Sequence, residues 1–468
     1  MNALLTAAAL ALVISVMLLA PRQGATALLL CGVLATAAGY FIARVKDDKR
    51  FLLQVFVAGL LVRMLVGTAI FYFHMQEFFG GDAYTYDFLG SAVLQAWRDG
   101  SSTVAAPGSN VDVGYGMSYF VAAIYWVAGE NMLAVQFANS VIGAATAPVI
   151  YLCARSIFRN LRVAYVSALF VAFYPSLVLW SSQGLKDGPM IFLLALAMLA
   201  TLKLDERFSL KHLAVLVAAL GGILSLRFYV FYMMAAAVGG AVVIGMRTTG
   251  SRNLLRQLAI VVGVGLAMTY LGVLRSAGTS FEHYGSFNQL QIARADQAES
   301  AKSGFAKDVD VSTASGALST IPVGLIYLLF APFPWQLASL RQSITLPEMV
   351  VWWASFPLLC AGLWFTLKHR MRQALPVLIF TMMLTLAYSV FQGNVGTAYR
   401  QRSQLLVFYF IFVSVGYELL KERREDKKRE VELDKLRTQQ AARRGAARRR
   451  QEREWESIAD NLSEKIGF

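Results

Sequence analysis

Long apolar runs separated by short polar connections recur along the chain as far as about residue 420. A helix that crosses the hydrocarbon core of a bilayer needs about 20 predominantly apolar residues. Twelve runs fit this requirement, at roughly residues 3–20, 25–43, 51–73, 132–153, 163–181, 188–203, 209–226, 228–246, 256–274, 347–366, 374–391 and 404–420. The pattern predicts an all-α membrane protein with a bundle of about 12 transmembrane helices.

Two further apolar runs, Tyr115 to Ala128 and Ile321 to Phe333, are shorter than a spanning helix. The second is closed by Pro332-Phe333-Pro334-Trp335, which ends a helix and places an aromatic ring at the depth of the membrane interface. We expect both to be juxtamembrane helices at the outer face.

The basic residues predict how the protein is oriented in the membrane, because they collect beside the cytoplasmic ends of spans. The chain is 57% apolar and 15% charged, with a net charge of +14. Its basic clusters between spans are Arg44, Lys46, Lys49 and Arg50; Arg155, Arg159 and Arg162; Lys203, Arg207 and Lys211; Arg247, Arg252 and Arg256; and Lys368, Arg370 and Arg372. Assigning these clusters to the cytoplasm puts both termini there too. We expect a multi-pass protein of a bacterial plasma (inner) membrane, with its site on the outer face.

The same assignment divides the chain into five parts: two N-terminal transmembrane helices (1–50), a transmembrane core (51–274) with a first outer loop (74–131), a second outer loop with a juxtamembrane helix (275–346), C-terminal transmembrane helices (347–420) and a basic tail (421–468). Within the second outer loop, Asn288 to Ser300 has helical character and Ser312 to Gly316 reads as flexible. This loop is either a lid over a site or a passive connector.

The tail carries 15 Lys and Arg against 11 Asp and Glu. We expect a cytoplasmic helix or a partly disordered extension, whose arginine clusters favour anionic lipid head groups. Aromatic residues that could stack on bases do not interleave with these charges, so nucleic acid is not an expected partner.

Asp82 lies just after the third span, within Phe79-Gly80-Gly81-Asp82-Ala83-Tyr84-Thr85-Tyr86-Asp87-Phe88. A carboxylate held where a bilayer meets water is suited to be the base of a membrane enzyme. The alternative is structural: Asp82 would cap a helix by accepting backbone N–H bonds from Tyr84 or Thr85.

Other charges also fall on the outer face. Lys186 and Asp187 open a helix, Arg227 sits in an apolar hairpin, and Arg400 and Arg402 precede the last span. Charges at such depth are costly and are usually retained for a site. Alternatively, Arg and Lys side chains extend to lipid head groups, and Asp187 caps its helix or pairs with Lys186.

This order of features resembles the GT-C membrane glycosyltransferases, the class of the protein O-mannosyltransferases and the aminoarabinose transferase of glycosyltransferase family 39. The resemblance covers about residues 55 to 260. Asp82, Tyr86 and Gly90 match the family pattern of a carboxylate in the first outer loop, a Tyr four residues on and a small residue after it. The juxtamembrane run and the basic-ended run at Asn131 to Arg155 follow in the family order.

The resemblance implies a role for several of these residues. It assigns the base to Asp82, makes Tyr86 and Asp187 candidates for contact with the lipid-linked substrate, and places Arg227 near the lipid phosphate. From their positions on the outer face we also expect Asp87 and Lys186 to contact the substrate. Arg400 and Arg402, with Arg227, are the expected ligands of the lipid phosphate, because guanidinium groups form paired, charge-assisted bonds with it. Many relatives carry a second carboxylate directly after the first, where this chain has Ala83, and a Pro pair where it has Gly114-Tyr115-Gly116. Asp87 is five residues from Asp82 and would face the same cavity poorly, so Asp82 alone is the expected base.

We therefore expect transfer of a sugar from a polyprenyl-phosphate donor to a lipid, glycan or protein acceptor. A lipid-linked oligosaccharide polymerase or ligase is the nearer alternative, since it would need Arg400 and Arg402 but not Asp82. A secondary transporter with Lys186, Asp187 and Arg227 along its path is the more distant one.

The sequence identifies no cofactor. The four histidines lack the spacing of zinc ligands, and neither a P-loop nor a dinucleotide-binding glycine pattern occurs. The departures around Ala83 leave a divalent metal open. The expected partners are thus membrane lipid, the polyprenyl-phosphate sugar and its acceptor.

Overall fold

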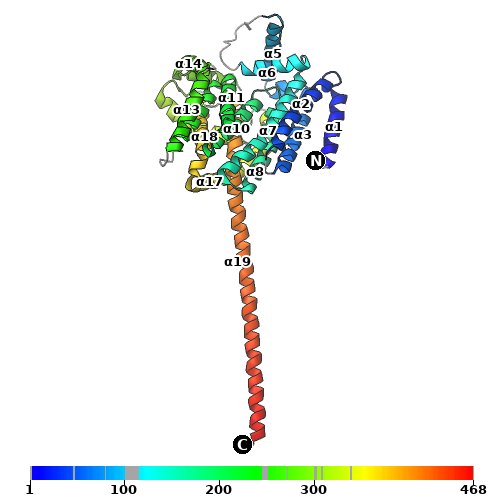
Figure 1. Cartoon of the computed structure of the whole chain (residues 1–468), viewed down its shortest axis with the longest axis vertical. Helices are drawn as coiled ribbons and strands as arrows, with labels where there is room; N and C mark the ends of the chain where they lie inside the picture. The colour runs from blue at the N-terminus through cyan, green and yellow to red at the C-terminus, as the bar shows by residue number, and fades with distance from the viewer. Residues whose placement is uncertain are drawn as a thin grey trace. The chain divides into compact units, whose positions relative to one another are not determined.

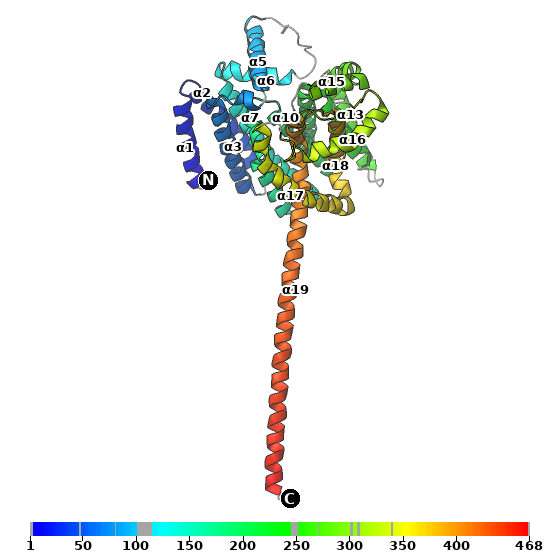
Figure 2. The ribbon, with the colours of Figure 1, turned by 180° about the vertical axis from the view of Figure 1, so that it is seen from behind.

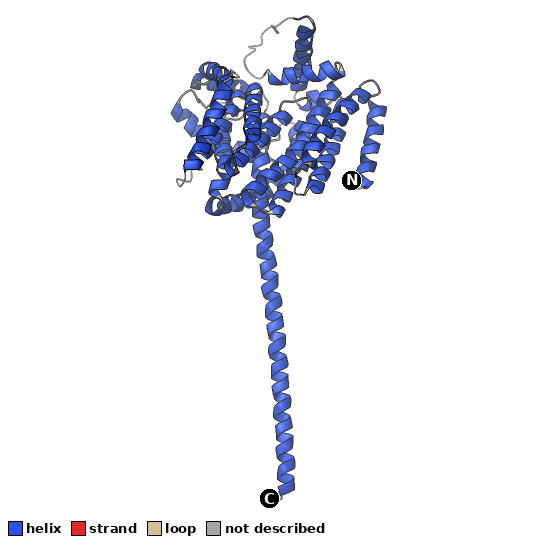
Figure 3. Ribbon diagram, in the orientation of Figure 1, coloured by secondary structure: helices blue, strands red, loops and turns tan. Residues whose placement is uncertain are grey.

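A computed structural model describes residues 3–45, 48–79, 81–100, 115–244, 251–270, 272–299, 303–306, 309–337 and 340–466. This part of the chain is helical and contains no strand, apart from one isolated β-bridge between Gly304 and Asn394. Figure 3 shows the helices throughout. The prediction of an all-α membrane protein is confirmed.

The first ten helices are α1 (Ala3–Leu19), α2 (Gly24–Ala43), α3 (Lys49–Tyr72), α4 (Gln76–Phe79), α5 (Asp82–Arg98), α6 (Gly116–Ala128), α7 (Met132–Phe158), α8 (Leu161–Phe173), α9 (Pro175–Ser181) and α10 (Asp187–Glu206). The others are α11 (Leu210–Leu226), α12 (Phe228–Ile244), α13 (Ser251–Tyr270), α14 (Val273–Tyr284), α15 (Phe287–Glu299), α16 (Ala314–Phe330), α17 (Leu340–His369), α18 (Met371–Phe391) and α19 (Val395–Ile466).

Seven of the described helices are long and apolar enough to cross a membrane, and two bent pairs raise the number to nine. The bent pairs are α8 with α9 and α13 with α14; five shorter apolar helices are α1, α6, α11, α12 and α16. A helix or a bent pair lies at each of the twelve predicted runs, but some are too short to count as spans by themselves. The number of crossings therefore stays a prediction.

The chain divides into two compact units, Met1–Val415 and Gly416–Phe468. In the first unit α7 is the central helix and packs against α2, α3, α8 and α10 (Figures 1 and 2). Most residues of α7 are buried, as expected for a helix surrounded by others. A second group forms around α18, which packs against α12 and α16. In the second unit the described residues are helical and mostly exposed.

The two short apolar runs form helices, but with shifted bounds. α6 lies across the bundle next to α5 (Figure 1), and α16 begins at Ala314 rather than near residue 321. Thr313 caps α16 by accepting a bond from the Gly316 N–H, so the stretch predicted to be flexible contains a helix start. The predicted helical character of Asn288 to Ser300 is confirmed by α15 as far as Glu299, and Ser300 lies outside the described residues.

A break in one predicted span shapes the site. The run at 163–181 forms α8 and α9, which meet at Tyr174 and Pro175 with a bend of 53°. Proline lacks an N–H and clashes with the preceding turn, so an α-helix cannot continue through it unperturbed. The bend carries the end of α9 toward the start of α10.

Candidate functional site

A cavity of about 730 Å³ lies among the starts of α5, α10, α17 and α19 and the end of α9. Its charged lining residues are Asp82, Lys186, Arg227, Arg341 and Arg400. Its aromatic lining residues are Phe78, Phe79, Tyr86, Trp180, Tyr229 and Tyr399. The structure thus brings together the predicted residues Asp82, Tyr86, Lys186, Arg227 and Arg400, although they come from segments up to 318 positions apart.

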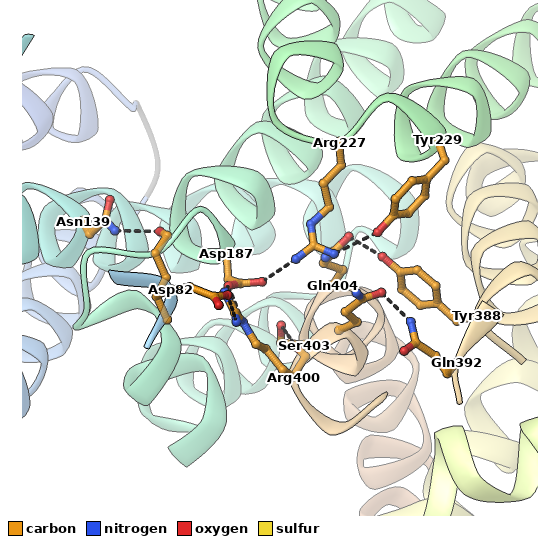
Figure 4. Close-up of polar contacts among 12 residues, drawn as sticks. Asp82, Asn139, Asp187, Arg227, Tyr229, Tyr388, Gln392, Arg400, Ser403 and Gln404 are labelled. Carbon is orange, nitrogen blue, oxygen red and sulfur yellow. Dashed lines mark hydrogen bonds and ion pairs between the residues drawn. The ribbon is translucent and has the colours of Figure 1, made fainter. Parts of the chain in front are cut away.

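Asp187 is the shared anionic partner of two arginines (Figure 4). Its carboxylate is fully buried at the first position of α10. Arg227 Nη2 donates to Oδ1 at 3.0 Å, and Arg400 Nε donates to Oδ2 at 2.7 Å. Arg400 Nη2 lies 2.6 Å from the same oxygen in the ion pair. Burial of these charges is tolerable because each one is paired and hydrogen-bonded. The partners of Asp187 are therefore the two guanidinium groups, and a contact with Lys186 alone is too simple a description.

Asp82 connects to this cluster through Arg400. Arg400 Nη1 donates to Asp82 Oδ2 at 2.5 Å, so one guanidinium joins both carboxylates. The Asp82 side chain is 49% exposed, whereas that of Asp187 is fully buried. The helix cap of α5 is Gly81, whose φ of 45° places it in the left-handed region, and no side chain caps this end. Asp82 is thus engaged with the cavity cluster rather than with the N–H groups of its own helix.

Tyr86 and Lys186 face each other across the cavity. Tyr86 lies one helical turn after Asp82 on α5, which explains why both line the same space. Lys186 Nζ is 6.0 Å from the centre of the Tyr86 ring. Burial lowers the pKa of Lys186 to about 8, with the charge of Arg227 acting in the same direction. Burial also raises the pKa of Tyr86 to about 12, so this phenol stays protonated at neutral pH.

Aromatic residues orient the two arginines. Arg227 Nη1 donates to the Tyr229 hydroxyl at 2.9 Å (Figure 4). The Tyr229 ring lies 6.3 Å from the Tyr388 ring, and Tyr388 donates to Gln404 at 2.9 Å. The Arg400 guanidinium lies 5.5 Å from the Trp180 ring.

Two predicted site residues lie elsewhere. Asp87 accepts a hydrogen bond from the Tyr125 hydroxyl in the packing of α5 on α6. Arg402 is 1% exposed and donates to the carbonyls of Leu328, Leu329 and Ala331 at 3.0 to 3.3 Å, at the end of α16. Neither side chain lines the cavity.

The position of Arg402 follows from the start of α19. We expected residues 399–402 to precede the last span, but α19 begins at Val395, so Arg400 and Arg402 are both helical. Residues two positions apart on an α-helix point about 200° apart. Only one of the two arginines can face the cavity, and it is Arg400.

Sequence reasoning missed Arg341, Trp180, Tyr229 and Tyr399 as lining residues. Arg341 is exposed at the start of α17, donates to the Glu77 carbonyl at 3.3 Å and lies 5.6 Å from the Phe78 ring. Its position as a basic residue within the predicted outer loop was the only feature of the sequence that could have identified it as a site residue. Trp180 and Tyr399 directly flank predicted polar segments, but an aromatic residue at such a place is also typical of the membrane interface.

No group of three or more His, Cys, Asp or Glu side chains that could hold a metal ion occurs among the residues described. Asp82, which lines the cavity, and Asp187, which is buried beside it, are both engaged by Arg400. A divalent cation would have to displace that guanidinium. Metal dependence stays a prediction.

Residues 112–272 match the family model of the dolichyl-phosphate-mannose-protein mannosyltransferases. The resemblance to the GT-C membrane glycosyltransferases is confirmed. The matched segment contains Lys186, Asp187 and Arg227, while Asp82 and Arg400 lie outside it. Together with the apolar helices, it supports a multi-pass membrane glycosyltransferase of the GT-C type. The search of curated proteins found no match.

Proposed function

We propose that the cavity transfers a sugar from a polyprenyl-phosphate donor to a hydroxyl or amine of a lipid, glycan or protein acceptor. The observation that carries this proposal is the shared cavity: Asp82, Arg227 and Arg400 line one space of about 730 Å³. A base and cationic groups at one place are what this reaction requires. We also propose that the cavity opens at the outer face of a bacterial plasma membrane.

The chemical step needs one proton acceptor and one stabilised leaving group. Asp82 takes the proton from the acceptor as the acceptor atom bonds to the anomeric carbon of the sugar. The bond between that carbon and the phosphate oxygen breaks, and its electron pair remains on the polyprenyl phosphate. Because Asp82 is half exposed, it is the carboxylate that a substrate can reach, whereas Asp187 is fully buried.

The cationic residues receive the phosphate. In the cavity, Arg400 is held between Asp82 and Asp187, and Arg227 is held by Asp187 and Tyr229. A phosphate oxygen offers a guanidinium the same charge-assisted, bidentate geometry as a carboxylate. Arg400 can therefore exchange its bond with Asp82 for one with the phosphate, which also leaves the Asp82 carboxylate available as a base. Lys186 and Arg341 add positive charge at the cavity wall.

A polymerase or ligase would use Arg400 in the same way, but would not depend on Asp82. The direct contact of Arg400 Nη1 with Asp82 Oδ2 favours an active role for this carboxylate. A transporter would bind the lipid-linked sugar without breaking the glycosidic bond.

The test is a transfer assay with purified protein in vesicles, offered synthetic polyprenyl-phosphate sugars and acceptors of the three classes. Wild type should release polyprenyl phosphate together with the glycosylated acceptor. Asp82→Asn keeps the size of the side chain but removes the base, so turnover should fall about 100-fold or more while the folded yield stays the same. Near-normal transfer by Asp82→Asn would reject the base and favour a polymerase or ligase mechanism. Movement of an intact donor across the membrane would favour a transporter.

A further inference from the structure

The turn between α9 and α10, residues 182–186, presents two charged residues to the site. Lys186 is its last residue, and Asp187 opens α10 directly after it. Ser182, Gln183 and Leu185 are at most 2% exposed, so the turn lies inside the protein. Buried backbone groups outside a helix need hydrogen-bond partners. Asn139 of α7 bonds to two carbonyls of the turn, and Arg63 of α3 bonds to residues that lead into it.

Asn139 of α7 holds the turn from one side (Figure 4). Its Nδ2 amide donates to the carbonyl of Gln183 at 2.6 Å and to that of Leu185 at 2.8 Å. The Asn139 side chain is fully buried. Both bonds fall within the three residues that precede Lys186, so the amide fixes the backbone that orients this side chain and the next one.

Arg63 of α3 holds the stretch that leads into this turn, from the end of α8 to Ser181. The missing N–H of Pro175 leaves the carbonyl of Val171 without its helical partner, and Arg63 Nη2 donates to this carbonyl at 3.2 Å. Arg63 Nη1 donates to the Ala172 carbonyl at 2.7 Å, and Nε donates to the Ser181 hydroxyl at 2.8 Å. A single guanidinium thus bridges the broken end of α8 and the last residue of α9.

Close packing leaves the turn little room to move. A Cβ at Gly143 of α7 would lie 2.4 Å from the Cβ of Ser181, and one at Gly67 of α3 would lie 2.9 Å from the Ser182 carbonyl oxygen. A side chain at either glycine would therefore displace the segment. The absence of side chains at these positions lets α3 and α7 hold the turn directly.

We propose that Asn139 and Arg63 are positioning residues, which hold the turn in place. Lys186 is thereby directed toward the donor phosphate, and Asp187 toward Arg227 and Arg400. This inference rests on the proposed function for the identity of the donor. Displacements of about 1 Å at a site can cost about 100-fold in rate, so a clamp remote from the reacting atoms still affects donor use.

The experiment compares Asn139→Ala with Ser140→Ala. Ser140 is the neighbouring residue on α7, is also fully buried, and bonds only within its own helix, to the Gln136 carbonyl. Two quantities are measured: the rate at which a water-soluble amine reagent labels Lys186, by peptide mass spectrometry, and the KM for the polyprenyl-phosphate sugar. Asn139→Ala should raise the labelling rate about fivefold and the donor KM about tenfold, and Ser140→Ala should change neither by more than about twofold.

A second pair of variants tests the Arg63 contact, and it also keeps the proposal testable if Asn139→Ala does not fold. Ser181→Ala removes the hydroxyl that accepts from Arg63, while Ser167→Ala removes a fully buried hydroxyl that bonds only to Val163 of its own helix. The first should shift labelling and KM in the same direction as Asn139→Ala, and the second should not.

The proposal is overturned if the turn variants match their controls in labelling, or if labelling changes while the donor KM does not. Labelling requires no turnover. If wild type transferred no sugar, the proposed function would fail, but the labelling comparison would still decide whether the clamp holds the turn.

Discussion

Arg400 and Arg402 lie two residues apart on α19, yet their surroundings differ in kind. Arg400 is bound to two carboxylates at the wall of a cavity, and one of these, Asp82, is half exposed. Arg402 is bound to three backbone carbonyls and to the Met349 sulfur, and it is 1% exposed. The first guanidinium neutralises anions, and the second satisfies the end of a helix.

The same division is seen in two further buried arginines, Arg227 and Arg63. Arg227 pairs with Asp187 beside the cavity, and Arg63 donates to carbonyls at the break between α8 and α9. A backbone carbonyl is a fixed part of the fold and cannot be replaced by a ligand, so an arginine that donates to carbonyls stabilises the fold. A carboxylate partner at a cavity can be replaced by another anion, so an arginine of the first kind can bind phosphate.

The largest expected effect separates Arg400 from Arg402. Arg400→Ala removes a charge-assisted contact to the donor, so kcat/KM for the polyprenyl-phosphate sugar should fall about 100-fold. Arg400→Lys keeps the charge but loses the bidentate fork and should lose about tenfold. Binding of polyprenyl phosphate without sugar, measured by calorimetry, should weaken in the same order. Wild-type affinity in the Ala variant would place the phosphate elsewhere.

Replacement of Arg402 should lower the stability of the protein and leave donor use unchanged. Arg402→Met fills much of the volume but leaves buried carbonyls without donors, which should destabilise the protein by about 2 kcal/mol. The melting temperature should drop, while the donor KM of the folded fraction stays close to that of wild type. A large rise in KM with an unchanged melting temperature would contradict the division between the two kinds of arginine.

A smaller effect concerns Lys186 and pH. Burial lowers the pKa of Lys186 to about 8, so its ammonium is present below that pH and is lost above it. If it helps to bind the phosphate, kcat/KM for the donor should fall by about tenfold as the pH rises from 7 to 9.5, because this ratio reports the free enzyme. Lys186→Arg should keep its charge and flatten this decline. A decline that persists unchanged in Lys186→Arg would assign it to another group.

The sequence predicted the helices well and the pairing within the site less well. Apolar runs determine where helices form, because each has to bury or expose a whole face. Asp82 and Tyr86, singled out by their four-residue spacing, lie one turn apart on α5 and line the same cavity. By contrast, the meeting of Asp187 with Arg400, 213 positions later, depends on how α10 and α19 pack. Local sequence carries no information on such a distant contact.

The placement of Arg402, unlike the distant contact of Asp187 with Arg400, could have been predicted from the sequence. Its assignment to the phosphate assumed that the helix began after it; with α19 beginning at Val395, the helical period alone separates it from Arg400. Arg63 was not predictable as a positioning residue, because its role depends on the break that Pro175 introduces in a neighbouring helix.

The smallest expected effect is on metal dependence. Asp82 lines the cavity, Asp187 is buried beside it, and both already accept bonds from Arg400. With Lys186, Arg227 and Arg341 also present, the cavity lining supplies the positive charge that a leaving phosphate needs. Removal of divalent cations with EDTA should therefore change sugar transfer by no more than about twofold, whereas a reaction that relied on a Lewis acid would lose several kcal/mol of stabilisation. If EDTA abolished transfer and Mg²⁺ or Mn²⁺ restored it, the carboxylates would have to exchange Arg400 for a cation. The anion-binding role of Arg400 would then require a metal, and the division between anion-binding and structural arginines would have to be revised.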